Sequence, residues 1–273
     1  MILYFSYQTK CTKTFGALLM NLWKKEELIV ALNLYWQIPY NKISGTSNPK
    51  IQELAKIIGR TPAALAYKLM NFTSLDNERQ RKGNKGKESY GKLDEIIWNV
   101  YFNQWEKLSY DSALILSELQ NKPVYDILKL DKEFDKLKGE EKERLIKTRV
   151  NQNSFRQRIL ASYNEKCCIT GIDIASLLIA SHIIPWAKNE QERLNPKNGI
   201  CLNAIHDKAF DTGLISITPE YKILLSEKIL SKKSDFSIQS FFIKYANEKI
   251  TLPDRYSPDK EFLAWHNKNI FNG

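Results

Sequence analysis

Residues 177–218 have the sequence LLIASHIIPWAKNEQERLNPKNGICLNAIHDKAFDTGLISIT. The apolar run Leu177 to Ala180 predicts a buried strand that ends beside His182, and a second run, Ile200 to Leu202, predicts another. Asn198 and Gly199 predict the turn before the second strand. AIHDKAFD then predicts a short helix that opens near His206. The stretch therefore indicates strand, loop, strand and helix, and it holds two of the three histidines of the chain.

The flanking residues predict an α+β chain that is mainly helical before this stretch. Residues 150–162 predict a helix with apolar side chains on one face. After the stretch, GLISIT and YKILLS around Pro219 and Glu220 predict a β-hairpin, and the tail predicts a final short helix. We therefore expect a helical domain at 1–139 and a mixed domain at 140–273 with its core motif at 167–218.

The charge of the chain favours a polyanionic partner. Lys and Arg number 41 against 31 Asp and Glu, which gives a net charge of +10 and a pI of about 9.2. The hydrophobic fraction of 43% is that of a globular protein. The longest apolar runs fall short of the roughly 18 residues that span a bilayer, and no export signal is evident, so we expect no membrane partner and a cytoplasmic location. Met20 is an alternative start to Met1.

The cysteines predict neither a disulfide framework nor a structural zinc site. Cys167 and Cys168 are adjacent, Cys11 and Cys201 are distant, and none forms a C-x-x-C pair. Too few thiolates lie at zinc-ligand spacing. We expect the cysteines to be buried and to pack as small apolar residues.

The N-terminal half contains a candidate DNA-recognition element. NLWKKEELIVALNLYW predicts an amphipathic helix. Two further helices are predicted on either side of a tight corner. Thr61 is the predicted N-cap of the second of these, and Pro62 is its first residue. Such a pair resembles a helix-turn-helix, although any small helical bundle shares the pattern. The second helix would present Lys68 and Asn71 to phosphates or base edges.

A glycine-rich basic segment, 78–92, follows these helices and is too polar to pack. It is either a solvated loop or a phosphate-binding loop. Its candidate DNA-binding side chains are Arg79, Arg81, Lys82, Lys85 and Lys87. Beyond it, an aromatic stripe at helical spacing from Trp98 to Trp105 predicts core packing.

The central stretch resembles the HNH, or ββα-metal, nuclease family, in particular HNH domains of bacterial restriction-type endonucleases. The resemblance lies in LLIASHIIPW and in R-L-NPKNGICLNAIHDKAFD-x-GL. It implies a metal-dependent DNA endonuclease of restriction or defence type that leaves 5′-phosphate and 3′-hydroxyl ends.

The resemblance also assigns roles to residues. His182 would be the general base, Asn198 would hold the loop, and His206 would bind one Mg²⁺ or Mn²⁺ per site. Many relatives have Asp where this chain has Ser181, so the missing charge must come from Asp207 and Asp211, one helical turn apart.

Several points stay open in the sequence. Arg193 is either a phosphate contact or a surface charge, and His266 lies outside the motif and is expected to be structural. The partners implied are double-stranded DNA, a second copy in a homodimer, and a cognate methyltransferase. Because of Ser181, a non-catalytic DNA-binding protein with a degenerate site is an alternative, as is a nuclease toxin or homing-type enzyme.

Overall fold

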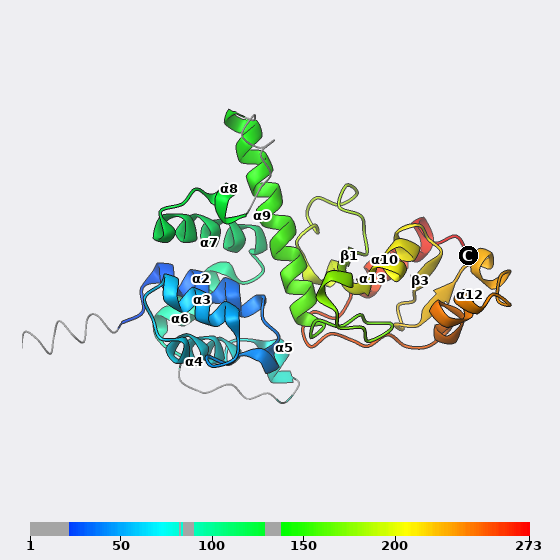
Figure 1. The fold of residues 1–273 in the computed structure, drawn as a ribbon, viewed down its shortest axis with the longest axis horizontal. Helices are drawn as coiled ribbons and strands as arrows, with labels where there is room; N and C mark the ends of the chain where they lie inside the picture. Colours follow the sequence, from blue (N-terminus) through cyan, green and yellow to red (C-terminus); the bar gives the residue numbers. More distant parts are fainter. Residues whose placement is uncertain (1–21, 82, 84–89, 129–137) are drawn as a thin grey trace, which may run out of the picture.

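The computed structural model describes residues 22–81, 83, 90–128 and 138–273. Its N-terminal part, which we call the helical half, lies to one side of a long helix, α9, and its C-terminal half lies to the other (Figure 1). The helical half consists of α2 (Lys25–Trp36), η1 (Tyr40–Lys42), α3 (Pro49–Ile57), α4 (Pro62–Thr73), α5 (Asn77–Arg81), α6 (Lys92–Tyr101), α7 (Trp105–Gln120) and α8 (Val124–Ile127).

Helix α2 is the centre of the helical half. Every residue from Leu28 to Trp36 except Asn33 is buried, and α3, α4, α6 and α7 pack around the helix. The predicted helix is therefore present, but its predicted amphipathic character is wrong, because a helix surrounded by others buries almost all of its faces. The two helices predicted after it are α3 and α4, and the N-caps Asn48 and Thr61 accept backbone amides as their sequence suggests.

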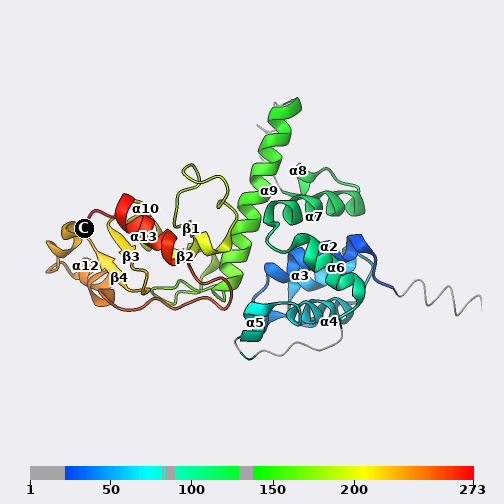
Figure 2. The ribbon, with the colours of Figure 1, turned by 180° about the vertical axis from the view of Figure 1, so that it is seen from behind.

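Helix α9 (Gly139–Ser162) joins the two halves. Its first turns carry charged, mostly exposed side chains, whereas Phe155 and Ile159 are buried. The helix contacts α2 and α7 on one side and strands β1 and β2 on the other (Figure 2). The boundary expected near residue 140 thus falls at the start of a helix that belongs to both halves.

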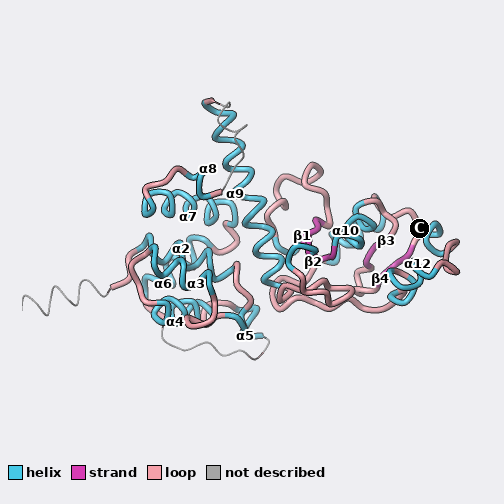
Figure 3. The backbone as a smooth tube through the Cα atoms, viewed as in Figure 1, coloured by secondary structure: helices cyan, strands magenta, loops and turns pink. Residues whose placement is uncertain are grey.

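The C-terminal half contains two small antiparallel sheets among short helices (Figure 3). Strand β1 (Leu178–His182) pairs with β2 (Gly199–Asn203) so that His182 lies opposite Gly199, and β3 (Ile215–Ile217) pairs with β4 (Ile223–Leu225). The remaining elements are η3 (Ala175–Leu177), η4 (Pro196–Asn198), α10 (Ala204–Asp211), α11 (Glu227–Leu230), α12 (Phe236–Phe241), η5 (Ile243–Tyr245) and α13 (Lys260–Asn269). The α+β class, both predicted strands and the predicted hairpin are confirmed.

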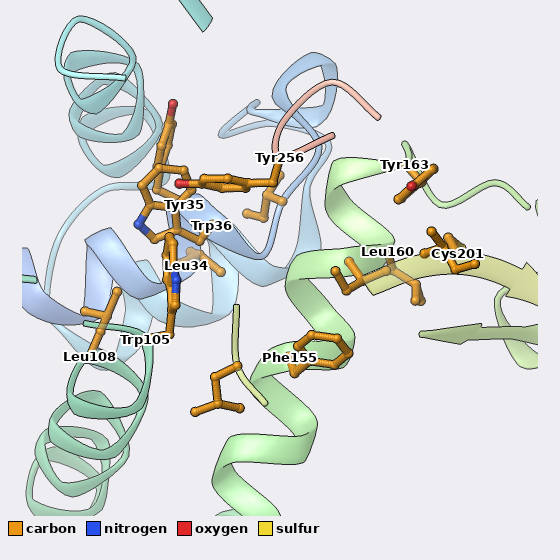
Figure 4. Packing of buried hydrophobic residues seen from close by; sticks show 14 of the residues in the cluster. Leu34, Tyr35, Trp36, Trp105, Leu108, Phe155, Leu160, Tyr163, Cys201 and Tyr256 are labelled. Carbon is orange, nitrogen blue, oxygen red and sulfur yellow. The ribbon is translucent and has the colours of Figure 1, made fainter. Parts of the chain in front are cut away.

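A C-terminal segment also packs into the helical half. Tyr256 contacts the rings of Trp36 and Trp105 (Figure 4). The adjacent Arg255 lies over the rings of Tyr35 and Trp36. The Arg255 guanidinium is 3% exposed and donates to the Tyr35 carbonyl at 3.1 Å. One hydrophobic core therefore continues from the helical half through α9 to the two sheets.

Two further expectations concern cysteines and membranes. Cys167, Cys168 and Cys201 are free and buried, as expected of small apolar residues, whereas Cys11 lies outside the described residues. Among the described helices, none combines the length and the apolar character that a bilayer crossing requires.

Candidate active site

A pocket of about 410 Å³ opens where strand β1 ends beside helix α10. It brings together the imidazole of His182 and the carboxylates of Asp207 and Asp211. The other lining residues come from β1 and the segment after it, and from the C-terminal end of the chain: Ile179, Ala180, Ser181, Ile183, Pro185, Trp186, His266 and Ile270. We call this the His182 pocket.

The His182 ring is held on two sides. It stacks on Phe155 of α9 with ring centroids 4.0 Å apart, and its Nε2 lies 2.9 Å from the Arg193 carbonyl oxygen. Because a carbonyl only accepts, Nε2 carries the proton, and Nδ1 of the neutral ring keeps a free lone pair. Burial lowers the pKa of His182, while the hydrogen bond to Arg193 opposes this shift, so the ring is neutral at physiological pH.

Asn198 fixes the loop that supplies this carbonyl. Its side chain is fully buried, accepts from the Ile184 amide at 2.8 Å, and donates to the carbonyls of Ile184 and Glu192 at 3.1 and 3.2 Å. The amide thus ties both ends of the loop between β1 and β2 together. These are backbone contacts of the kind that the sequence analysis expected for Asn198.

Asp207 and Asp211 lie one turn apart on α10 and face the pocket together. Burial raises the pKa of Asp207, with the Ser181 hydroxyl and Lys208 opposing. Burial and the Asp207 charge raise the pKa of Asp211, and Lys208 opposes here too. Two carboxylates that raise each other's cost of ionisation favour a cation between or beside them.

The prediction that His206 is a metal ligand is corrected by its position. Its side chain is 1% exposed and does not line the His182 pocket. Nε2 lies 2.8 Å from the Phe241 carbonyl and Nδ1 lies 3.1 Å from Asn203 Oδ1, so both nitrogens already face an oxygen of the protein. On α10, residue 206 points about 100° away from residue 207, which turns the imidazole toward α12 and η5. His206 is a packing residue.

The remaining residues of the pocket fit a hard divalent cation. Mg²⁺ is commonly held by one or two carboxylates together with waters and substrate phosphate. Asp207 and Asp211 supply two carboxylates, and the buried Ser181 hydroxyl lies beside Asp207. In the described part of the chain, no three His, Cys, Asp or Glu side chains gather closely enough to form a full ligand set. The donors match Mg²⁺ or Mn²⁺ rather than a metal that is held by protein ligands alone.

The structure overturns three predicted DNA contacts in the helical half. Lys68 is buried and binds both carboxylate oxygens of Asp94 at 2.8 and 2.9 Å. Asn71 is 4% exposed. Arg79 is 3% exposed, lies over the Tyr40 ring and pairs with Asp254 at 3.3 Å. The two residues of α4 that were predicted to contact DNA, Lys68 and Asn71, are therefore packed inside the protein.

The other predicted DNA contacts have different outcomes. Arg193 is half-buried and lies over the Trp186 ring, and its guanidinium donates to the Trp186 carbonyl and to Glu190 at 2.8 Å each. The guanidinium thus helps to hold the loop, and a phosphate contact by Arg193 stays a prediction. Lys82, Lys85 and Lys87 lie outside the described residues, and the Arg81 side chain is not described although its backbone ends α5.

Sequence reasoning missed two supports of the site. Phe155, more than twenty residues before His182, forms the surface on which that ring stacks. His266 lines the same pocket from α13. Neither residue carries a local signal, although the helical spacing of Phe155 with Ile159 already indicated a buried face.

Residues 167–218 match the family model described as HNH endonuclease. A search of curated proteins finds no match to the chain. The matched residues contain β1, β2 and α10, together with His182, Asn198, Asp207 and Asp211. The chain therefore contains an HNH endonuclease domain at residues 167–218.

Proposed function

We propose that this protein is a DNA endonuclease that uses one divalent metal ion and His182 to hydrolyse phosphodiester bonds. One observation carries the proposal: the His182 Nε2 proton is committed to the Arg193 carbonyl, and the ring shares a pocket with two carboxylates. This combination supplies a neutral base and, in the same cavity, a negatively charged site for a cation. The net charge of +10 favours DNA as the polyanion.

In this proposal His182 Nδ1 accepts a proton from the attacking water. A neutral imidazole is a suitable base at physiological pH, and the lowered pKa of His182 favours this neutral form. Phe155 and the Arg193 carbonyl restrict the rotation of the ring, so the lone pair is held in one direction. Because the base is already held in position, less conformational entropy is lost on the way to the transition state.

Asp207 and Asp211 would hold the cation, with Ser181 near them. The ion, when bound, supplies positive charge that stabilises the phosphate and the leaving 3′-oxygen. The carboxylates take the place of the Asp that many relatives carry before the base histidine. Cleavage on this path leaves 5′-phosphate and 3′-hydroxyl ends.

The biological role that we propose is restriction or defence. It rests on the resemblance of ASHIIPW and NPKNGICLN to restriction-type HNH domains. In that role a homodimer would cut both strands, because the described residues of each chain form one such site. A cognate methyltransferase would protect the host DNA.

The test is plasmid cleavage by the purified protein with Mg²⁺ or Mn²⁺, on unmodified and cytosine-modified DNA. We expect wild type to convert supercoiled plasmid to nicked or linear forms, chelation to stop it, and His182→Ala to slow it by at least about 100-fold, the lower range for a lost general base. His206→Asn tests the corrected assignment and should retain cleavage in its folded fraction. If wild type leaves every substrate intact, the endonuclease proposal fails.

A further inference from the structure

A second cavity, of about 510 Å³, lies between the helical half and the loop that joins β1 to β2. Residues 102–104, which connect α6 to α7, line it together with Trp105, the first residue of α7. Side chains from 190–195 of the loop and Tyr256 of the C-terminal segment also line it. We call it the Trp105 pocket. Its volume lies within the roughly 300–1,000 Å³ of pockets that bind small ligands.

Aromatic rings form part of the wall of the Trp105 pocket. Trp105 and Tyr256 are each 6% exposed, and their rings meet edge to face with centroids 5.4 Å apart (Figure 4). Phe102 stacks on Trp98 and is 41% exposed. The pocket therefore offers ring surfaces against which a flat ligand can pack.

Amide side chains line the same cavity. The side chains of Asn103, Gln104 and Gln191 make no hydrogen bond to another group in the described part of the chain. Each of these amides has two N–H donors and a carbonyl acceptor. They can therefore pair with a ligand that carries both donors and acceptors along one edge.

The charges of the pocket are largely matched by partners within the protein. Glu190 pairs with Arg193 at 2.8 Å, and Glu192 accepts from the Asn195 side chain at 2.6 Å. A carboxylate has further lone pairs beyond one such bond, so it can still accept from an amino group. Two lysines against four glutamates line the pocket, which therefore lacks the excess of cations that an anionic ligand needs.

These features select one class of ligand. A phosphate group would meet more carboxylates than cations, and a wholly apolar ligand would leave the amides without partners. A metal ion is disfavoured, because no three His, Cys, Asp or Glu side chains gather as a ligand set in the ranges that the structure describes. A flat, neutral group with donors and acceptors on its edge fits both the rings and the amides. In a DNA substrate, that group is a nucleobase.

We propose that the Trp105 pocket binds a nucleobase that has left the base stack of DNA. This assignment rests on the proposed function, which takes DNA as the substrate. Asn and Gln side chains pair with the edge of adenine, and Glu accepts from the amino group of cytosine. Aromatic side chains contribute the stacking that the base loses when it leaves the duplex.

The loop between β1 and β2 links the Trp105 pocket to the His182 pocket. Pro185 and Trp186 line the His182 pocket, and residues 190–195 line the Trp105 pocket. Between these positions, the Arg193 carbonyl holds the His182 ring. A base bound in the Trp105 pocket therefore contacts the loop that positions the proposed general base.

Binding of duplex oligonucleotides to the full chain without divalent metal, followed by fluorescence anisotropy, tests this proposal in the absence of cleavage. One duplex is fully paired, a second set carries one mismatched base of each of the four kinds, and a third has a pair of opposed abasic sites at that position. A mismatched base costs less to extrude. Wild type should bind the mismatched duplexes at least about fivefold more tightly than the other two, which is the lower range for base stacking on an aromatic side chain.

Two substitutions at exposed positions remove the contacts that the base would make. Phe102→Ser removes a ring surface and Gln191→Ala removes an amide, so each should lose most of the preference for mismatched duplexes. Phe236→Ser and Gln239→Ala are the matched controls, because these side chains lie on α12 and do not line the Trp105 pocket. Both controls should keep the wild-type preference. Thermal unfolding shows whether each variant is folded at the temperature of the binding measurement.

The outcomes separate this proposal from the proposed function. If wild type binds the abasic duplex as tightly as the mismatched ones, or binds no duplex, the nucleobase site is overturned. The same holds if Phe102→Ser and Gln191→Ala both keep the full preference, whether or not the protein cleaves plasmid. If the variants lose the preference as expected but wild type cleaves no plasmid, only the catalytic proposal fails.

Discussion

At the scale of single residues, the site depends on which atoms are already bound within the protein. His182 and His206 occupy the same motif, but the former has one nitrogen committed to Arg193 and the latter has both facing protein oxygens. The composition and spacing of the motif do not distinguish His182 from His206. Only hydrogen-bond partners separate a candidate base from a packing residue. They remove His206 from the three predicted metal ligands and leave Asp207 and Asp211 as the candidates.

Asn198 yields a prediction on stability. Asn198→Ala leaves the buried amide and carbonyl of Ile184 without the partner they have in Asn198 and removes one of two hydrogen bonds to the Glu192 carbonyl. It should lower the free energy of unfolding by at least about 2 kcal/mol. Asn189→Ala is the matched control, because Asn189 caps amides of the same loop in a more exposed position. Denaturant unfolding measures both. Equal losses in the two variants would show that Asn198 does not hold the loop.

His266 yields a prediction on pH. Its pKa is about 4 in the folded chain against 6.5 for the unperturbed residue. Between these values the unfolded chain binds a proton that the folded chain does not, so the free energy of unfolding falls as pH falls, by up to about 3 kcal/mol. His266→Gln removes this contribution. Urea unfolding from neutral pH to about pH 4 should give a shallower decline for the variant, and an equally steep decline would contradict the buried neutral ring.

At the scale of elements, the sequence predicts much of the C-terminal half because its patterns are local. Strands β1 and β2 follow apolar runs, and Asn203 caps α10. The helical half is less predictable. Lys68 and Asp94 lie 26 residues apart and bury their charges together, a pairing that no local pattern reveals. The same reason hides Phe155 and His266 from sequence analysis, since tertiary packing brings them to the pocket.

The contact between β2 and α9 yields a prediction at this scale. A Cβ at Gly199 would lie 2.7 Å from Phe155 Cζ and would also collide with Ile159. Gly199→Ala should therefore push α9 from the strand, destabilise the fold by about 1 to 3 kcal/mol, and disturb the ring that supports His182. Unfolding and plasmid cleavage measure the two effects.

Gly91→Ala is the matched control for this substitution. An added Cβ at Gly91 would lie 3.7 Å from the Asp94 carboxylate, which is an ordinary contact. We expect nearly unchanged stability and cleavage. If Gly199→Ala behaves in the same way, close packing of α9 on β2 is not required for the site.

At the scale of the whole molecule, the helical half supports the pocket through the chain that leads into α13. Arg255 and Tyr256 are buried among residues of the helical half, and α13 begins four residues later at Lys260. The helical half therefore restrains the helix that brings His266 to the site. This gives that half a structural role whether or not it also contacts DNA.

Arg255→Ala tests this coupling. The change removes a buried cation that lies 3.4 Å from Asp76 and leaves that carboxylate without it, so it should destabilise the protein by about 3 to 5 kcal/mol. It should also increase amide hydrogen exchange in α13. Arg60→Ala removes another arginine–carboxylate pair, with Glu27 at 2.8 Å, but within the helical half alone. Equal exchange in α13 in both variants would contradict the coupling.

The most direct test of the central claim is the single-turnover rate of plasmid cleavage as a function of Mn²⁺ concentration for Asp207→Asn. We expect the variant to need at least about tenfold more Mn²⁺ than wild type, or to cleave at least about 100-fold more slowly at every concentration. Asp173→Asn, which changes an exposed carboxylate paired with Lys166 at 3.9 Å, should match wild type. An Asp207→Asn curve that overlays the wild-type curve would contradict the assignment of the cation site to the His182 pocket.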